Sequence, residues 1–456
     1  MATPAAGLLT GCAMGGDDDD SGGESANQGD KTAENPFGVK ADAPLEVVIF
    51  NGGYGEEYAK AHEAMYNEKY PNAKITHSAT QEISKTLQPR FVDGSPPDVV
   101  NNSGAGQIDQ GSLVAQGALA DLNELLEAPS LDIPGKKVGD TLLPGVVDVG
   151  SYDGKFHVLN ISYTAYGIWY SQKLFADRGW QYPKTWDEHI ALCRTIKAAG
   201  IAPWTYAGKH PRYMSWPVIS TAIKLGGLDV AKNIDNLEPN AWKSDAMKQS
   251  ADAWYQIVKD QFILPGTPGL DHVQSQTEWC RGKAALISCG SWIENEQKKV
   301  TPEGFNMAIA PTPSLGAGDK LPFEAIRGTA GEPFIVPAKA KNVPGGLEYF
   351  RTVLSMRGAK DFTQKVSALS VVAGAADGAT LPPGLSTVVK ALDASGTNGF
   401  NWVYNNYYRK LERELVDAAC GEFFSGRISP TEFLDQCQKG ADMIASDSSL
   451  KKYKRA

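Results

Sequence analysis

The sequence predicts an α/β protein with a parallel, doubly wound sheet, distributed over two or three lobes. Short apolar runs alternate with amphipathic segments of helical length, which is typical of strands joined by crossover helices. The length of 456 residues also exceeds what one ordinary hydrophobic core accommodates. No run approaches about 18 consecutive apolar residues, so no membrane-spanning helix is expected.

The first predicted strand is an apolar run at residues 45–50 (Leu-Glu-Val-Val-Ile-Phe), which leads into a glycine-containing loop at 51–53. A helix that ends before Pro71 should follow. Residues 73–77 and 97–100 then predict two further strands. Ordered structure is therefore expected to begin with the first of these strands.

Two capping boxes predict the starts of later helices. Residues 185–188 (Thr-Trp-Asp-Glu) open a helix that should end near Gly200. Residues 429–432 (Ser-Pro-Thr-Glu) open another, with proline at the first helical position. An amphipathic helix at about 403–424 precedes it, so the two should form a helical hairpin that turns at Gly426.

The net charge of −9 is concentrated at the N-terminus. Residues 1–43 hold eight acidic residues against two lysines, which gives −6 there and leaves only −3 for the rest of the chain. An acidic chain without a basic stripe argues against nucleic acid as a partner, because phosphate binding requires clustered Lys and Arg. The short basic end at 451–455 is expected to be a solvated tail.

Residues 9–12 (Leu-Thr-Gly-Cys) resemble a bacterial lipobox, whose cysteine is lipidated and becomes the first residue of the mature protein. Cys12 would then anchor the chain, while Asp17–Asp20 and the polar residues as far as Asn35 would form an unstructured tether. The eleven residues before Cys12 contain no Lys or Arg, unlike the start of a signal peptide. A start further upstream and a chance match in a disordered tail are the alternatives.

The other five cysteines are an odd set, so at least one thiol is free unless it pairs between chains. Cys193 follows a helical apolar pattern and is expected to be buried. Cys280 with Cys289, and Cys420 with Cys437, could each form a disulfide in an oxidising compartment. The helical hairpin makes the second pair the better candidate. No metal site is predicted, because no CxxC or neighbouring histidine set accompanies these residues.

Motifs of catalysis are scarce in this sequence. It has no GxxxxGK[ST], HExxH or GxSxG pattern, and the glycine-rich stretch at 104–109 lacks the third glycine of a dinucleotide fingerprint. No cofactor is therefore predicted. A pair of carboxylates for glycoside hydrolysis remains open, because their separation depends on the fold.

Four groups of residues carry a family resemblance. In chain order they are Gly154-Lys155 with Gly167–Phe175 (Gly-Ile-Trp-Tyr-Ser-Gln-Lys-Leu-Phe); Pro183-x-Thr185-Trp186-Asp187-Glu188; Gly282-Lys283-Ala284-Ala285 with Gly290-Ser291-Trp292; and Ser429-Pro430-x-Glu432 with Ala441-Asp442. Together they resemble the family 1 extracellular solute-binding proteins of carbohydrate ABC importers, over about residues 44–450.

This resemblance implies a two-lobed periplasmic-binding-protein-like fold of type II, with a hinge that the chain crosses several times. Residues 1–43 would be lipobox and tether. Lobe one would hold 44–162 and 332–373, and lobe two 163–331 and 374–456. Ligand would bind between the lobes, and closure around it would be a hinge motion.

A sugar offers apolar C–H faces to aromatic rings and a rim of hydroxyls to amides and carboxylates. Ten such residues are candidates for ligand binding: Trp292, Tyr54, Asn51, Asn102, Tyr163, Trp204, Tyr206, Tyr213, Glu332 and Trp402. Trp292 is the first choice, because it matches the stacking position of the family's Gly-x-Trp motif. Tyr163 and Glu332 are expected at two hinge crossings, and Trp216 is expected to be structural.

The loop at 51–57 and the Asn/Tyr-rich segment at 400–408 most resemble the actinobacterial branch that binds N-acetylglucosamine and N,N′-diacetylchitobiose. The resemblance thus implies a monomeric, lipid-anchored protein on the extracellular face of the cell membrane, which delivers an amino sugar to permease subunits and is not an enzyme. The alternatives are a binding protein for another sugar or polyol, a secreted glycoside hydrolase or lyase, and an adhesion module without lobe closure.

Overall fold

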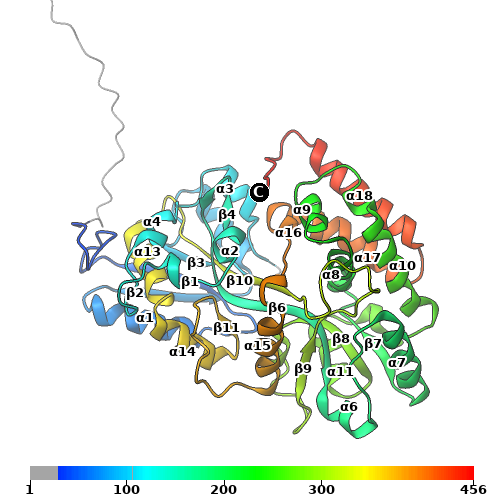
Figure 1. Ribbon diagram of the computed structural model, residues 1–456. Helices are drawn as coiled ribbons and strands as arrows, with labels where there is room; N and C mark the ends of the chain where they lie inside the picture. Colours follow the sequence, from blue (N-terminus) through cyan, green and yellow to red (C-terminus); the bar gives the residue numbers. More distant parts are fainter. Residues whose placement is uncertain (1–28, 105, 456) are drawn as a thin grey trace, which may run out of the picture.

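The computed structural model describes residues 29–104 and 106–455. One nine-stranded sheet runs through both halves of the molecule in the order β2-β1-β3-β10-β6-β8-β7, with β9 and β11 also paired to β6 (Figure 1). We call the half built on β1, β2 and β3 lobe one, and the half built on β7, β8 and β9 lobe two. The strands are β1 (Leu45–Phe50), β2 (Ile75–Thr80), β3 (Val99–Asn101), β6 (Leu159–Ser171), β7 (Ala202–Thr205), β8 (Ala284–Gly290), β9 (Met307–Ala310), β10 (Arg327–Ile335) and β11 (Leu369–Ser370), with a separate hairpin of β4 (Ser151–Tyr152) and β5 (Lys155–Phe156).

Helices cover both lobes. Those of lobe one are α1 (Glu57–Lys69), α2 (Ile83–Val92), α3 (Gln110–Ala115), α4 (Asn123–Glu127), α5 (Val146–Val149), α13 (Val343–Val353) and α14 (Met356–Val366). Those of lobe two are α6 (Gln172–Arg178), α7 (Trp186–Ala198), α8 (Ser215–Gly226), α9 (Asp229–Asp235), α10 (Asp245–Lys259), α11 (His272–Cys280), α12 (Ile293–Glu296), α15 (Pro383–Ser395), α16 (Tyr404–Tyr407), α17 (Asp417–Phe424), α18 (Pro430–Ser446) and the π-helical turn η6 (Leu411–Val416). Short 3₁₀ turns lie at η1 (Gly139–Thr141), η2 (Pro211–Met214), η3 (Ala241–Lys243), η4 (Thr267–Gly269) and η5 (Gly396–Asn398).

The sheet is parallel at its two ends and antiparallel at its centre. β1 pairs in parallel with β2 and β3, and β7 with β8, as predicted. The centre is formed by β6 and β10, which pair antiparallel over most of their length. These two strands carry the chain from lobe one to lobe two and back, so they run in opposite directions. Tyr163 lies within β6 and Glu332 within β10.

The predicted helical starts are confirmed. Thr185 caps α7 and Ser429 caps α18, each in a complete capping box with the glutamate three residues later. The expected single helix at 403–424 is instead divided into α16, η6 and α17. α17 and α18 form the predicted hairpin, with Gly426 in the left-handed region at φ 76°.

The cysteines are buried thiols. Cys193, Cys280, Cys289, Cys420 and Cys437 are all free in the structure, so neither candidate pair is bridged. Cys420 and Cys437 both lie in the apolar core between α17 and α18, where they pack as small hydrophobic side chains. Among the described residues no group of His, Cys, Asp and Glu is arranged to hold a metal ion. None of the helices found in the same residues is long and apolar enough to span a membrane.

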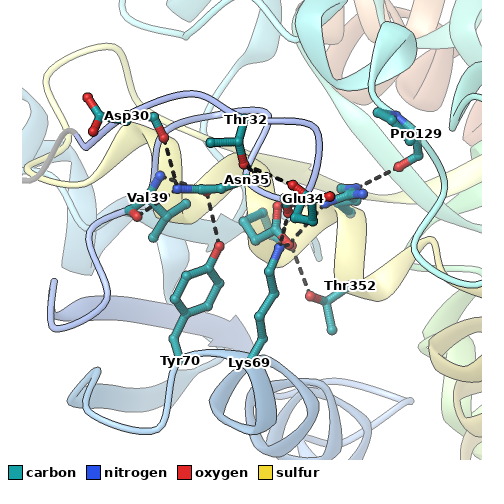
Figure 2. Close-up of polar contacts among 11 residues, drawn as sticks. Asp30, Thr32, Glu34, Asn35, Val39, Lys69, Tyr70, Pro129 and Thr352 are labelled. Atoms are coloured by element: carbon teal, nitrogen blue, oxygen red, sulfur yellow. Dashed lines mark hydrogen bonds and ion pairs between the residues drawn. The ribbon is translucent and has the colours of Figure 1, made fainter.

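The segment before β1 belongs to the folded lobe, so the prediction that order begins near Leu45 is wrong. Phe37 and Val39 are buried in the core of lobe one. Asn35 both donates to Val39 O (3.0 Å) and accepts from Val39 N (2.9 Å), and Tyr70 of lobe one donates to Asn35 Oδ1 (3.2 Å; Figure 2). The burial of Phe37 and Val39, together with the hydrogen bonds of Asn35 to Val39 and Tyr70, holds this segment against lobe one. Cys12 and the acidic run at 17–20 lie outside the described residues.

A buried ion cluster lies beneath this segment. Lys69 Nζ donates to the backbone oxygen of Glu34 (2.6 Å) and to Glu348 Oε1 (2.7 Å) (Figure 2). The Glu348 carboxylate is completely buried and also contacts the Arg351 guanidinium at 3.3 Å. Arg351 Nε donates to Pro129 O (2.6 Å). The N-terminal segment therefore closes over a charge cluster that links α1, α13 and the loop after α4.

We expect a protein that starts at Leu45 to unfold at least roughly 5 °C below one that starts at Gly29. The shorter protein loses the burial of Phe37 and Val39, which contributes about 3 kcal/mol, and each kcal/mol shifts the midpoint of a lobe of this size by about 2–4 °C. Differential scanning calorimetry of the two proteins measures the difference. Equal midpoints would show that the segment adds nothing to the stability of lobe one.

Candidate functional site

Loops at the carboxyl ends of β1 and β3 in lobe one face loops of lobe two that follow β8. Ligand sites of open α/β sheets lie at such strand ends. Tyr54, in the loop after β1, interacts electrostatically with Glu332 of β10 and with Tyr166 and Glu296 of lobe two, and burial raises the pKa of its phenol. Residues of both lobes therefore converge beside the central strands.

Lobe two contributes an aromatic corner, which we define as Tyr166, Tyr213, Trp216 and Trp292. The Trp292 ring meets Tyr166 edge to face at 5.4 Å and Trp216 at 6.1 Å between ring centroids. Tyr213 lies against Trp216 at 4.3 Å. Trp292 folds back over Gly290, where a Cβ atom would overlap its ring. Three of the four rings stay partly exposed, which leaves them available to an apolar ligand face.

A buried arginine supports this corner from behind. The Arg327 guanidinium is 4.1 Å from the centre of the Tyr166 ring and 3.8 Å from that of Trp402, which is a double cation–π contact. Its Nε donates to Asn401 Oδ1 (3.0 Å). Burial lowers the pKa of Arg327. Tyr166 is thus held in one position by a charged side chain that is itself inaccessible.

Charged groups border the corner on one side. Glu412 and Arg413 lie on the π-helical turn η6, and their side chains pair at 3.0 Å. Such turns occur frequently at functional sites, because the extra residue redirects side chains. A groove of about 580 Å³ between η6 and α3 is lined by residues of both lobes, among them Asp109, Arg409 and Arg413. Of these groups, Arg413 interacts electrostatically with both Tyr166 and Tyr213 of the corner.

Lobe one contributes one aromatic platform. The Phe50 ring is half-buried at the end of β1, between Gly52 and Gly104, where a Cβ atom on either glycine would overlap it. Asn51 follows it with an exposed side chain. The apolar run at 45–50 predicted Phe50 only as a strand residue, although its place at the carboxyl end of that strand, before a glycine-containing loop, is the local feature that marks it as a candidate for the site.

Glu332 forms a polar centre between the lobes. It has a left-handed backbone at φ 57°, a conformation that costs a non-glycine residue about 1 kcal/mol or more and that concentrates at functional sites. Asn101 and Ser103, which are hydrogen-bonded to each other (2.8 Å), lie beside its carboxylate and favour its charged form. Burial raises the pKa of Glu332 to about 7. The group can therefore accept or donate a hydrogen bond near neutral pH.

This raised pKa predicts a pH dependence of stability. Between the ordinary value of 4.5 and about 7, folded Glu332 retains a proton that the unfolded chain releases. The folded state then binds more protons, so its stability falls as pH rises through this window. We expect Glu332→Gln to flatten the decline of Tm between pH 5 and 8, measured by thermal unfolding. The exposed Glu303→Gln variant is the control; parallel curves for Glu332→Gln and the parent would contradict the assignment.

The structure removes four of the ten sequence candidates from the ligand surface. Trp204, Tyr206 and Trp402 are at most 2% exposed and belong to the core of lobe two. Asn102 is fully buried, and its side chain donates to Ile108 O (2.9 Å) and accepts from Ile108 N (2.8 Å). Aromatic and amide residues suit both a core and a ligand site, and in this structure these four lie in the core. Asn101, one residue before Asn102, is also buried, and its Nδ2 donates to Ser103 Oγ (2.8 Å) and to Pro333 O (3.2 Å).

Tyr163 lies on the opposite side of the sheet from the aromatic corner. It is three residues before Tyr166 on β6, and residues an odd number apart face opposite sides of a strand. Tyr163 lines a separate cavity of about 950 Å³ behind the central strands, together with Leu369, Leu392 and Phe400. Tyr166 therefore stands beside the interlobe space where Tyr163 was expected, whereas Trp216, at 7% exposure, is buried within the corner, in agreement with the structural role expected of it.

The two lobes are in direct contact at one place, between the loop after β1 and α12. Asn295 of α12 donates through Nδ2 to Gly53 O, and a Cβ atom on Gly53 would lie 3.3 Å from Glu296 Cγ. Gln276 donates to the Glu296 carboxylate (2.8 Å), and burial raises the pKa of Glu296. Trp292, Tyr213, Tyr54, Asn51 and Glu332 are the candidates that remain beside this interlobe space.

Known proteins share this arrangement. The family described as bacterial extracellular solute-binding protein matches residues 52–360. The chain is 36% identical over 457 aligned residues, covering 100% of it and 96% of the relative, to the diacetylchitobiose binding protein NgcE of Streptomyces coelicolor. Among solved structures, a chitin oligosaccharide binding protein matches with a TM-score of 0.70 at 18% identity, over 89% of this chain and 99% of that one. The GacH receptor of Streptomyces glaucescens matches with a TM-score of 0.66 at 17% identity, over 90% and 100%.

These structural matches confirm the predicted two-lobed fold of type II, although identities this low establish the fold alone. The family match covers more than half of the chain, and the full-length relative supports it independently. One motif of the resemblance, Gly290-Ser291-Trp292, places Trp292 in the aromatic corner. The chain therefore belongs to the family of bacterial extracellular solute-binding proteins.

Proposed function

We propose that this protein is the sugar-binding component of an ABC importer and that it captures N,N′-diacetylchitobiose, N-acetylglucosamine or both. The observation that carries the proposal is full-length similarity to a diacetylchitobiose binding protein. The aromatic corner supports it, because exposed rings stack on the apolar faces of pyranoses. Glu332, Asn101 and Ser103 supply the mixed donors and acceptors that hydroxyl and acetamido groups require.

Capture would proceed by closure of the lobes. The sugar would stack on the corner of lobe two, and the loop at 51–55 of lobe one would then cover it through contacts such as Gly53 with Asn295. Closure excludes water, so each hydrogen bond to the sugar is made in a medium of low polarity. Release to the permease requires moderate affinity; micromolar dissociation corresponds to about −8 kcal/mol.

The cellular setting forms part of the proposal. Lipidation of Cys12 would hold a monomer on the extracellular face of the cell membrane, beside the permease subunits that receive the sugar. The chain would perform no chemistry on its ligand. Because residues 29–43 pack on lobe one, an anchor at the N-terminus would hold the protein through that lobe.

Isothermal titration of the protein that starts at Gly29 tests the function. Diacetylchitobiose, N-acetylglucosamine and maltose are the ligands, and mass analysis of the recovered sugar follows each titration. We expect micromolar or tighter binding of acetylated sugars alone, recovered unchanged. Binding of maltose alone would replace the amino-sugar assignment by another cargo. Cleavage of the disaccharide would show a hydrolase, with Glu332 and Glu296 as the first carboxylates to substitute.

A further inference from the structure

The C-terminal tail, Lys451–Arg455, is not the solvated end that its charge predicted. It follows α18 of lobe two and returns to the seam between the lobes, where the C-terminus lies between α3 and α16 (Figure 1). Tyr453 is only 2% exposed. Its hydroxyl donates to Gly111 O of lobe one (2.7 Å), and its backbone N–H donates to the Tyr408 hydroxyl of lobe two (2.9 Å). One residue of the tail is thus bonded to both lobes.

The Tyr453 ring also joins the lobes by packing. It meets Tyr152 of lobe one edge to face at 5.0 Å and Tyr407 of lobe two at 5.4 Å, and the latter two rings are 5.6 Å apart. A Cβ atom on Gly111 would lie 2.9 Å from Tyr407 O and 3.4 Å from the Tyr453 ring. Only a glycine at this position lets α3 approach lobe two so closely.

The tail is fastened to lobe two beyond Tyr453. Arg455 Nη1 pairs with the buried Asp235 carboxylate at 2.7 Å and donates to Asn401 O (2.8 Å). Its backbone N–H donates to Asn236 Oδ1 (2.7 Å). Lys451, at the other end of the tail, forms an ion pair with Asp153 of lobe one. Tyr453 is therefore held by lobe two through its own N–H and through Arg455, and its ring and hydroxyl are presented to lobe one.

We propose that this tail is an interlobe latch, which stabilises the arrangement in which the two lobes touch. Moving the lobes apart at this seam would break the Tyr453–Gly111 hydrogen bond, the contact with Tyr152 and the Lys451–Asp153 pair. It would leave the Arg455–Asp235 pair intact, because both partners belong to lobe two. Contacts made in only one arrangement shift the population toward it, even without ligand.

The latch also bears on ligand affinity, and this part rests on the proposed function. The apparent dissociation constant equals the intrinsic one divided by the fraction of protein in the competent arrangement. If both lobes contribute to the ligand site, a tail that holds the lobes together raises the fraction of protein that is competent to bind. The shape of the ligand-free protein does not depend on which sugar binds, so the two parts can be tested separately.

Tyr453→Ala in the protein that starts at Gly29 is the main variant. We expect a larger ligand-free radius of gyration in small-angle X-ray scattering, and an affinity for diacetylchitobiose about tenfold weaker by calorimetry. Tyr453→Phe keeps the ring and loses only the bond to Gly111, so both effects should be smaller. Asp153→Ala removes the ion pair with Lys451 by changing an exposed residue of lobe one, and it should also increase the radius of gyration and weaken the affinity. Lys452→Ala is the matched control, because within the described part of the chain the hydrogen bonds of Lys452 Nζ go to the carbonyls of Asp447 and Leu450 in its own segment.

Unchanged scattering and affinity in Tyr453→Ala would overturn the latch. If that variant does not fold, Tyr453→Phe and Asp153→Ala decide: parent-like behaviour of both would overturn it as well. An expanded shape with no sugar binding in any protein, parent included, would keep the latch and reject the proposed cargo. Expansion with unaltered affinity would limit the latch to the ligand-free state and remove its link to capture.

Discussion

Replacing Trp292 with alanine is expected to weaken diacetylchitobiose binding at least about thirtyfold. The substitution removes the ring that lies over Gly290 and withdraws the edge-to-face partner of Tyr166 and Trp216. Truncation of a tryptophan at the centre of a binding site costs about 2 kcal/mol or more, and every 1.4 kcal/mol is a factor of about ten in affinity. Isothermal titration of the parent and the variant measures the loss.

Trp180→Ala is the matched control for this prediction. Trp180 packs edge to face on Phe175 at 5.7 Å, beside α6 and away from the aromatic corner. Its removal should leave affinity unchanged while it deletes the same kind of side chain from the same lobe. Full affinity in Trp292→Ala, together with an unchanged unfolding midpoint, would mean that the ring is part of the core and not of the site.

Substitution of Glu348 by glutamine is expected to destabilise lobe one by about 3 kcal/mol or more. The carboxylate is completely buried and is shared by Lys69 and Arg351, of which Arg351 is itself 4% exposed. Removing the negative partner leaves two cations beside a neutral amide, and breaking a buried pair in this way costs about 3–5 kcal/mol. Thermal and urea unfolding measure the loss, and sugar affinity should be unchanged wherever the variant remains folded.

Glu68→Gln provides the comparison at the surface. Glu68 and Arg357 form a bidentate ion pair, with Nη1–Oε2 and Nη2–Oε1 distances of 2.6 and 2.8 Å, but both side chains are about 60% exposed. An exposed pair contributes about 0–1 kcal/mol, so this variant should unfold close to the parent. Equal effects of the two substitutions would show that burial of Glu348 is not what makes its cluster important.

Several elements of the fold could be predicted because their signals lie within a few residues. The apolar run at 45–50 forms β1 over the same residues. The capping boxes at Thr185 and Ser429 open α7 and α18 as expected, because a cap needs only its own turn of helix. The segment at 29–44 was missed for the opposite reason: its contacts come from Lys69 and Tyr70, which lie far along the chain.

The site was predictable in kind but only partly in its residues. A glycine two positions before Trp292 lets the ring fold back, so this motif is local and its residue lies in the corner. Trp204 and Trp402 share the chemistry of Trp292 but lie in the core, because α10 and Arg327 cover them. A ring that suits a sugar face equally suits a core, so composition cannot separate the two.

Only the tertiary structure shows which side of the sheet each aromatic residue of β6 faces and how the C-terminal tail contacts the two lobes. Tyr163 and Tyr166 are both aromatic residues of β6, yet they face opposite sides of the sheet, and only Tyr166 lies in the aromatic corner. The basic tail has the composition of a solvated end, and its lysines are at least partly exposed, but Tyr453 within it is buried against Tyr152 and Gly111 of the other lobe. Strands, helix caps and the Gly-x-Trp motif depend on neighbouring residues, so the sequence predicts them. The exposure of a side chain and the identity of its contacts depend on packing between segments hundreds of residues apart, which no local pattern encodes.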